Sequence, residues 1–260
     1  MTITQPESSI ETATPQNGME HAPGDREMTM LEHLQELRHR LVVSVIAVVV
    51  GLLVSLVPVP GSTSLVDFVI GTLVERAPGG MIVSLRPGEA FFTYLQVSLI
   101  LGIALAMPML TYQVLAFVTP ALYPKEKRYL YIAVPGVTLS FFVGVLFCYS
   151  LMLPAAIQFL GGFAADKIRP QWAAEHYLDF VVAFLFWVGV TFELPIVMYF
   201  LSKLGVVSAQ RMAHFRKYAF VLAFVIGAII TPTPDPVNQT IVSLPIYFLY
   251  EFGIILARFA

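Results

Sequence analysis

The apolar run from Tyr177 to Leu201 constrains the fold of this chain more than any other feature. Between Asp179 and Lys203 it contains one charged residue, Glu193. A helix of this length spans a bilayer, which requires about 20 apolar residues. Glu193 would then lie at hydrocarbon depth, where an ionisable side chain costs about 2.5–3.5 kcal/mol or more and usually marks a functional path. The alternative is a packing role, with the acid hydrogen-bonded to a neighbouring helix or protonated and inert.

The composition supports a membrane protein. Hydrophobic residues make up 57% of the chain and charged residues 12%, whereas a soluble domain carries about twice that charge. The one cysteine, Cys148, lies in an apolar run. An intrachain disulfide framework is therefore excluded, and Cys148 is expected to be a small buried hydrophobe.

Six apolar stretches predict an all-α integral membrane protein, at residues 41–57, 90–118, 130–160, 177–201, 218–231 and 237–257. The second, third and fourth exceed the length of a perpendicular crossing, so they should tilt or project beyond the membrane. The fifth has about 14 residues, which cover about 21 Å at helical rise and are short for hydrocarbon. The sixth is interrupted by Pro245 and is expected to end near Glu251. The last two helices are therefore predicted to be short.

The basic residues predict the orientation, because cytoplasmic loops carry an excess of Lys and Arg. Eleven of the 15 lie before the first, after the second, after the fourth and after the sixth stretch. The alternate side holds only Arg76, Arg86, Lys167 and Arg169. Both termini are expected in the cytoplasm, with residues 58–89 forming the largest outward loop. Within that loop, "SLVDFVIGTLV" predicts a short helix on the membrane surface.

The chain is expected to have two parts. Residues 1–28 are polar and rich in Pro, Gly, Ser and Thr, which predicts a disordered cytoplasmic tail. Residues 29–260 form the transmembrane domain, and its first helix begins with a capping box at Thr29–Glu32. The sequence has no nucleotide-binding loop, HExxH or CxxC motif. We expect no catalytic residue, no cofactor and no metal, and hence no enzyme.

Small residues and prolines predict how the helices pack and bend. Small residues recur every four positions in the first and third stretches, which allows helices to approach closely; they are Ala47, Gly51 and Ser55, then Gly136, Ser140 and Gly144. Five prolines lie inside or near the ends of apolar stretches and predict kinks; they are Pro108, Pro135, Pro154, Pro195 and Pro245.

Two acids on the cytoplasmic side have ordinary structural explanations. Glu36 lies four residues before Arg40, a spacing that gives a weakly stabilising ion pair on a helix. Glu126 follows Pro124 in the first turn of the third membrane helix, where an acid suits the helix dipole. Local physics alone leaves a functional role open for both.

Four segments of the chain together resemble the TatC family, the six-helix receptor of the twin-arginine protein translocase. They are "HLQELRHRL" at 33–41, "FVTPALYPKEKR" at 117–128, "FELPIVMYFLSKLGVVS" at 192–208 and "TPTPDPVNQTIVSLPIYFLYEFGIILARF" at 231–259. The resemblance implies six kinked transmembrane helices in a concave, glove-like arrangement. It also implies export of folded proteins with twin-arginine signal peptides across the cytoplasmic (inner) membrane, driven by the proton-motive force.

The resemblance assigns roles to residues at three places. The signal-peptide site maps onto Glu36 and Glu126, with His33, Arg38 and Phe117 on the same face. The intramembrane acid of the family maps onto Glu193. Docking of single-span TatA- and TatB-like subunits maps onto Thr231, Asp235 and Gln239. Other expected partners are further copies of the chain and the lipid bilayer, with no nucleic acid.

Thr72 departs from the family pattern, because the family often carries a proline at that position in the first outward loop. The rival functional class is a solute or ion transporter that uses Glu193 as its intramembrane site. Such transporters are often built from internal repeats, and the two halves of this sequence show none. A purely structural membrane scaffold is a third class, but it would not need acids displayed on a basic surface.

Overall fold

The computed structural model describes residues 30–58, 63–78, 82–118, 127–162, 172–231 and 235–260. Regular secondary structure in these ranges is entirely helical. In chain order the elements are α1 (Met30–Leu56), α2 (Leu65–Val74), α3 (Glu89–Val118), α4 (Lys127–Phe147), the π-helical turn η3 (Cys148–Met152), α5 (Leu153–Gly162), α6 (Ala174–Phe192), α7 (Leu194–Lys203), α8 (Ala209–His214), α9 (Arg216–Ile230) and α10 (Pro236–Ala257). The predicted tail at 1–28, the Thr29 cap and Glu126 lie outside the described residues.

The predicted apolar stretches all appear as helices, which confirms the all-α membrane fold. Within the described residues, five helical segments are long and apolar enough to cross a membrane: Leu31–Leu56, Glu89–Phe117, Ile132–Gly162, Ala174–Lys203 and Pro236–Ala257. The remaining stretch is α9, which has 15 residues and so extends for about 22 Å. Its predicted shortness is confirmed. The helix predicted within "SLVDFVIGTLV" is α2, capped by the Ser64 hydroxyl.

The last helix is longer than the sequence indicated. We predicted that α10 would stop near Glu251, but its 22 residues run unbroken through Pro245 to Ala257. A proline removes only one backbone hydrogen bond from a helix, and the flanking turns supply the others. Glu251 lies within this helix, where its carboxylate pairs with Arg216 of α9 at 2.9 Å and accepts a hydrogen bond from the Tyr247 hydroxyl at 2.9 Å.

Helical geometry is interrupted at two of the five predicted proline positions. The π-helical turn η3 immediately precedes Leu153 and Pro154. Further along, α6 ends at Phe192 and α7 begins at Leu194, with Pro195 in its first turn. At Pro108 and Pro135 the helices α3 and α4 continue without a break. A proline in an apolar stretch of this chain therefore does not by itself end a helix.

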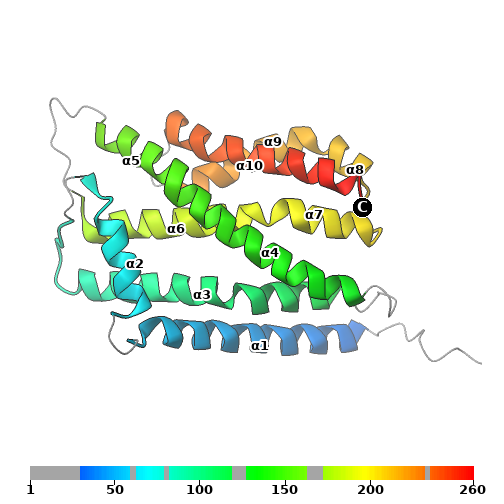
Figure 1. The fold of residues 1–260 in the computed structure, drawn as a ribbon, viewed down its shortest axis with the longest axis horizontal. Helices are drawn as coiled ribbons and strands as arrows, with labels where there is room; N and C mark the ends of the chain where they lie inside the picture. Colours follow the sequence, from blue (N-terminus) through cyan, green and yellow to red (C-terminus); the bar gives the residue numbers. More distant parts are fainter. Residues whose placement is uncertain (1–29, 59–62, 79–81, 119–126, 163–171, 232–234) are drawn as a thin grey trace, which may run out of the picture.

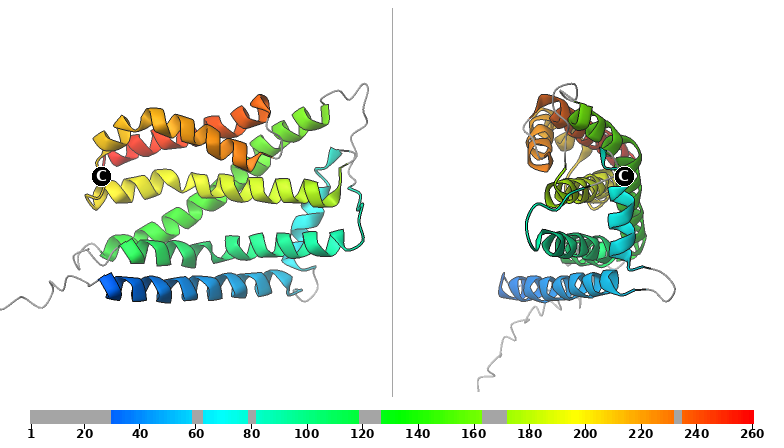
Figure 2. Two further views of the ribbon diagram at one scale, coloured as in Figure 1. Left: turned by 180° about the vertical axis from the view of Figure 1, so that it is seen from behind. Right: turned by 90° about the vertical axis from the view of Figure 1, so that its left-hand side faces the viewer.

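Helices α1 and α3 lie side by side along their length (Figures 1 and 2). A Cβ atom added to Gly102 of α3 would lie 2.6 Å from the backbone nitrogen of Leu52 in α1, so no larger residue is accommodated. About one turn away, the Ser55 hydroxyl reaches the Ser98 carbonyl at 3.4 Å. Gly51 and Ser55 of the predicted small-residue row of α1 thus pack against α3. This packing holds the start of α1 beside the end of α3.

Helix α6 lies at the centre of the molecule, with α4 crossing it diagonally and α2 running across the long helices on the same side (Figure 1; Figure 2, right). The Ser140 hydroxyl of α4 donates to the Phe192 carbonyl at 2.6 Å, and Gly144 packs against the Phe192 side chain. Gly136 has nothing within 4 Å of an added Cβ. Two members of the predicted row therefore form the α4–α6 contact, and the third does not.

Candidate functional site

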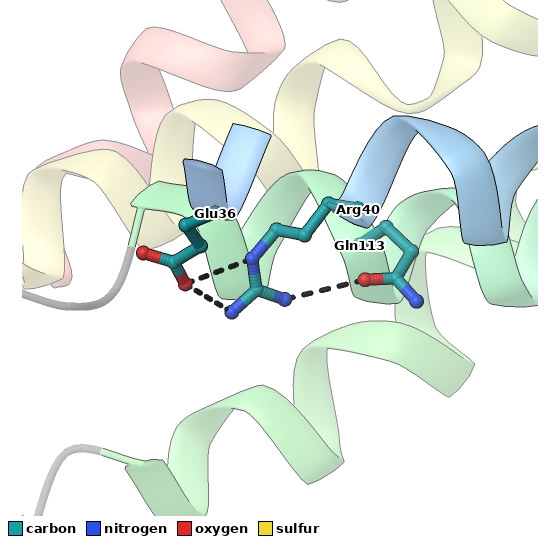
Figure 3. Close-up of polar contacts among 3 residues, drawn as sticks. All are labelled: Glu36, Arg40 and Gln113. Atoms are coloured by element: carbon teal, nitrogen blue, oxygen red, sulfur yellow. Dashed lines mark hydrogen bonds and ion pairs between the residues drawn. The ribbon is translucent and has the colours of Figure 1, made fainter. Parts of the chain in front are cut away.

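The ends of α1 and α3 bring together Glu36, Arg40 and Gln113 (Figure 3). One carboxylate oxygen of Glu36, Oε1, accepts from Arg40 Nε at 2.9 Å and from Nη2 at 2.5 Å. Arg40 Nη1 donates to Gln113 Oε1 at 3.2 Å. The other carboxylate oxygen, Glu36 Oε2, is buried and has no hydrogen-bond partner among the described residues. The predicted i,i+4 pair is confirmed, and it leaves one acceptor oxygen unused.

The same two helix ends place His33 against Phe117. Their rings stack with centroids 4.5 Å apart and an interplanar angle of 22°. Arg38 is exposed, and no ion pair joins it to another residue of the described ranges. The structure thus gathers three of the five predicted signal-peptide residues, His33, Glu36 and Phe117, at the adjoining ends of two helices. Glu126 falls between the described ranges 82–118 and 127–162.

Gln113 was missed by the sequence reasoning. It lies 73 residues from Arg40, so no local pattern links the two side chains. A signal was nevertheless available, because Gln113 is a polar residue within the apolar segment "LTYQVLAF". A buried amide inside an apolar helix needs a hydrogen-bond partner, and Gln113 is 93% buried.

Glu193 occupies the junction between α6 and α7. Its carbonyl accepts from the backbone N–H groups of Ile196 at 3.1 Å and Val197 at 3.0 Å, which starts α7. Its side-chain oxygen Oε1 is buried and lacks a partner among the described residues. This oxygen is therefore an acceptor that water or another polypeptide could satisfy.

The three predicted docking residues all lie where α9 meets α10. The Thr231 hydroxyl donates to the Gly227 carbonyl at 3.0 Å. Asp235 caps α10 by accepting from the Asn238 backbone at 2.8 Å. Gln239 Nε2 crosses to α9, where it donates to the Phe224 carbonyl at 2.9 Å. Of these three bonds only that of Gln239 joins α10 to α9, whereas those of Thr231 and Asp235 stabilise the end of α9 and the start of α10.

Glu89 is a further buried acid that the sequence reasoning did not single out. Its Oε2 accepts from the backbone N–H groups of Leu85 at 2.6 Å and Arg86 at 2.9 Å. Its Oε1 accepts from the backbone N–H of Glu175 at 3.1 Å, at the start of α6. One carboxylate thus joins the loop before α3 to the beginning of α6.

Comparison with known proteins identifies the family. The model of the Sec-independent protein translocase protein (TatC) family matches residues 32–245, which is most of the chain. The chain belongs to the TatC family. Its TatC relatives include a protein of Aquifex aeolicus, 37% identical over 90% of this chain and 96% of the relative. Another, from Carboxydothermus hydrogenoformans, is 34% identical over 90% of this chain and 95% of the relative.

Relatives also occur in plastids and among solved structures. The chloroplastic TATC of Arabidopsis thaliana is 36% identical over 90% of this chain and 67% of the relative. The crystal structure of a twin-arginine translocase receptor TatC superimposes with a TM-score of 0.76 at 37% identity, covering 88% of this chain and 99% of that one. This TatC chain is a multi-pass membrane component of a protein translocase. The solute-transporter alternative finds no support in any of these matches.

Proposed function

We propose that this chain is the receptor subunit of a twin-arginine translocase in the cytoplasmic membrane, with both termini in the cytoplasm. It binds the twin-arginine signal peptides of folded cargo and recruits single-span TatA- and TatB-like subunits. The chain carries out no catalysis of its own, and export draws on the proton-motive force. The observation that carries the proposal is the cluster of Glu36, His33 and Phe117 at adjoining ends of α1 and α3, in a chain of the TatC family.

Recognition of paired arginines requires carboxylates that can accept the planar guanidinium fork. Arg40 already occupies Oε1 of Glu36 and fixes the orientation of the carboxylate. A rotation of the Glu36 side chain would expose its unpartnered and buried Oε2 to an incoming arginine. The second arginine would pair with Glu126. The stacked rings of His33 and Phe117 supply an apolar, polarisable surface beside the first contact.

Affinity for a fluorescent twin-arginine signal peptide tests this proposal. Losing one charge-assisted hydrogen bond costs about 1.5–3 kcal/mol, so Glu36→Ala or Glu126→Ala is expected to weaken binding about tenfold or more. Gln35→Ala is the matched control, because Gln35 is an exposed neighbour on α1. The affinity of a twin-lysine peptide, which keeps the charge but lacks the planar guanidinium groups, measures what those groups contribute to binding. Unchanged affinity in both acid variants would refute the assignment.

The orientation rests on the distribution of basic residues. It is tested by introducing single cysteines at Ser84 and at Gln210, both of which are exposed. The native Cys148 is buried and contributes no background. A membrane-impermeant thiol reagent should label the two positions from opposite sides, and labelling from one side would overturn the proposed topology.

We also assign the junction at Glu193 and the α9–α10 hairpin to partner subunits. Glu193 offers a buried acceptor without a partner in the described ranges. The hairpin offers Thr231, Asp235 and Gln239 close to the turn between two helices. A single-span helix with one polar side chain could satisfy Glu193, and because a polar group is costly in hydrocarbon, such a contact favours association.

A further inference from the structure

A nearly apolar cavity of about 320 Å³ lies between α2, α3, α4 and α6. This volume is at the lower end of the range found for small-molecule sites. Its inner wall includes Ala104 of α3 and Leu185 of α6, and Phe68 of α2 and Leu146 of α4 flank it. Both flanking side chains are 64% exposed, so the cavity opens toward the lipid. Apolar cavities do not hold water stably, and the chemistry of the walls therefore selects an apolar occupant.

A positively charged side chain, that of Arg76, lies beside this cavity. Arg76 lies two residues after the end of α2. Its guanidinium carbon is 4.3 Å from the ring centroid of Tyr149, which itself lines the cavity. Arg76 Nε donates to the Tyr149 hydroxyl at 3.2 Å, which leaves the O–H of that tyrosine able to donate elsewhere. No carboxylate within the described ranges forms an ion pair with Arg76. The guanidinium therefore retains donors for an anion.

Arg76 lies at one end of the cavity, next to the lining residues Leu73 and Tyr149. The hydroxyl of Tyr177, three residues into α6, donates to the Leu73 carbonyl at 2.9 Å, so the end of α2 is level with the start of α6. The residues of α6 that line the cavity, Val182 to Phe186, are five to nine positions further along that helix, or about 8–14 Å deeper. An amphiphile with an anionic head at Arg76 and an alkyl chain directed inward matches this arrangement.

We propose that this cavity is a phospholipid site, in which Arg76 and the Tyr149 hydroxyl bind the phosphodiester and one acyl chain fills the space between α2, α3, α4 and α6. Basic residues at membrane interfaces recognise lipid phosphates electrostatically, and tyrosine is enriched at that level of the bilayer. Thr72, which stands where TatC proteins often have proline, lies in the cavity wall. Its hydroxyl donates to the Phe68 carbonyl at 2.8 Å, so it presents its methyl group as apolar surface.

The lipid would also join elements that otherwise have few contacts. Helices α2 and α4 both line this space, and the occupied cavity would connect the outward loop to the crossing helix. A site that requires both a phosphate and an acyl chain differs from the unspecific lipid layer around any membrane protein. Ligands that lack either part therefore test the proposal.

Native mass spectrometry of the full chain in detergent measures retention of added phosphatidylglycerol. Two further probes separate the parts of the ligand: diacylglycerol with the same chains, and glycerol phosphate without chains. We expect one retained phosphatidylglycerol, about tenfold weaker retention of diacylglycerol, and no retention of glycerol phosphate. Tenfold is the loss expected for one charge-assisted contact.

Two variants test the residues. Arg76→Gln should weaken phosphatidylglycerol binding about tenfold and leave diacylglycerol unchanged. Ala104→Phe fills the cavity and should weaken both lipids. The matched controls are Arg86→Gln, an exposed arginine away from the cavity, and Leu99→Phe, an exposed α3 residue that does not line it. Native-like binding by Arg76→Gln, or equal losses in the controls, would overturn the proposal. If Ala104→Phe unfolds, the Arg76→Gln comparison alone decides.

Discussion

Removing the charge of Glu89 should loosen the connection between α3 and α6. Glu89 is 95% buried, and its carboxylate accepts three backbone N–H groups, from Leu85, Arg86 and Glu175. In Glu89→Gln one of the two oxygens becomes an NH₂ group, which can only donate. The best orientation keeps the amide oxygen toward Leu85 and Arg86, where two donors converge. The NH₂ group then faces the N–H of Glu175 and cannot accept it.

The magnitude follows from that single lost acceptor. A hydrogen bond to a charged group contributes about 1.5–3 kcal/mol, and we expect Glu89→Gln to lower the free energy of unfolding by about this amount. Glu89→Ala should cost more, because it leaves three buried N–H groups without an acceptor, each at about 1–3 kcal/mol.

The chain carries its own reporter of unfolding. Cys148 is its one cysteine and is fully buried, so a thiol-reactive dye labels the protein only when the core opens. Melting curves in detergent should show Glu89→Gln unfolding at lower temperature than the native chain. Glu75→Gln is the control, since Glu75 is an exposed acid at the end of α2. If Glu89→Gln and Glu75→Gln unfolded at the same temperature, the proposed role of the Glu89 carboxylate would be refuted.

Two more predictions concern helix packing and partner contact. Gly102→Ala would drive a Cβ into the backbone of α1; we expect a loss of about 1–3 kcal/mol in the same dye assay, whereas Gly136→Ala, with open space around it, should melt like the native chain. At the α6–α7 junction, Glu193→Gln should retain much of the export activity because it preserves hydrogen bonding. Glu193→Leu should insert normally but lose co-purification of partner subunits, as should Gln239→Leu. Full export by the leucine variant of Glu193 would make this residue structural.

Local sequence determined the membrane segments, the shortness of α9 and the break at Pro195. Each of these depends on residues close together in the chain: the hydrophobicity of about 20 consecutive positions, or the missing N–H of one proline. The i,i+4 pair of Glu36 and Arg40 was predictable for the same reason, because helical geometry fixes that distance. The motifs that resemble TatC also contain Glu36, Glu126 and Glu193, the acids with proposed roles.

Tertiary structure decided the features that depend on two or more helices. Gln113 completes the Glu36–Arg40 cluster from 73 residues away, and Glu89 reaches an N–H group 86 residues along the chain. The lipid-facing cavity needs walls from four helices. In α10, Pro245 left the helix intact, and Glu251 within it pairs with Arg216 of α9. Hydrophobic patterns specify that a helix is inserted, but close packing of side chains determines which helices meet and at what register.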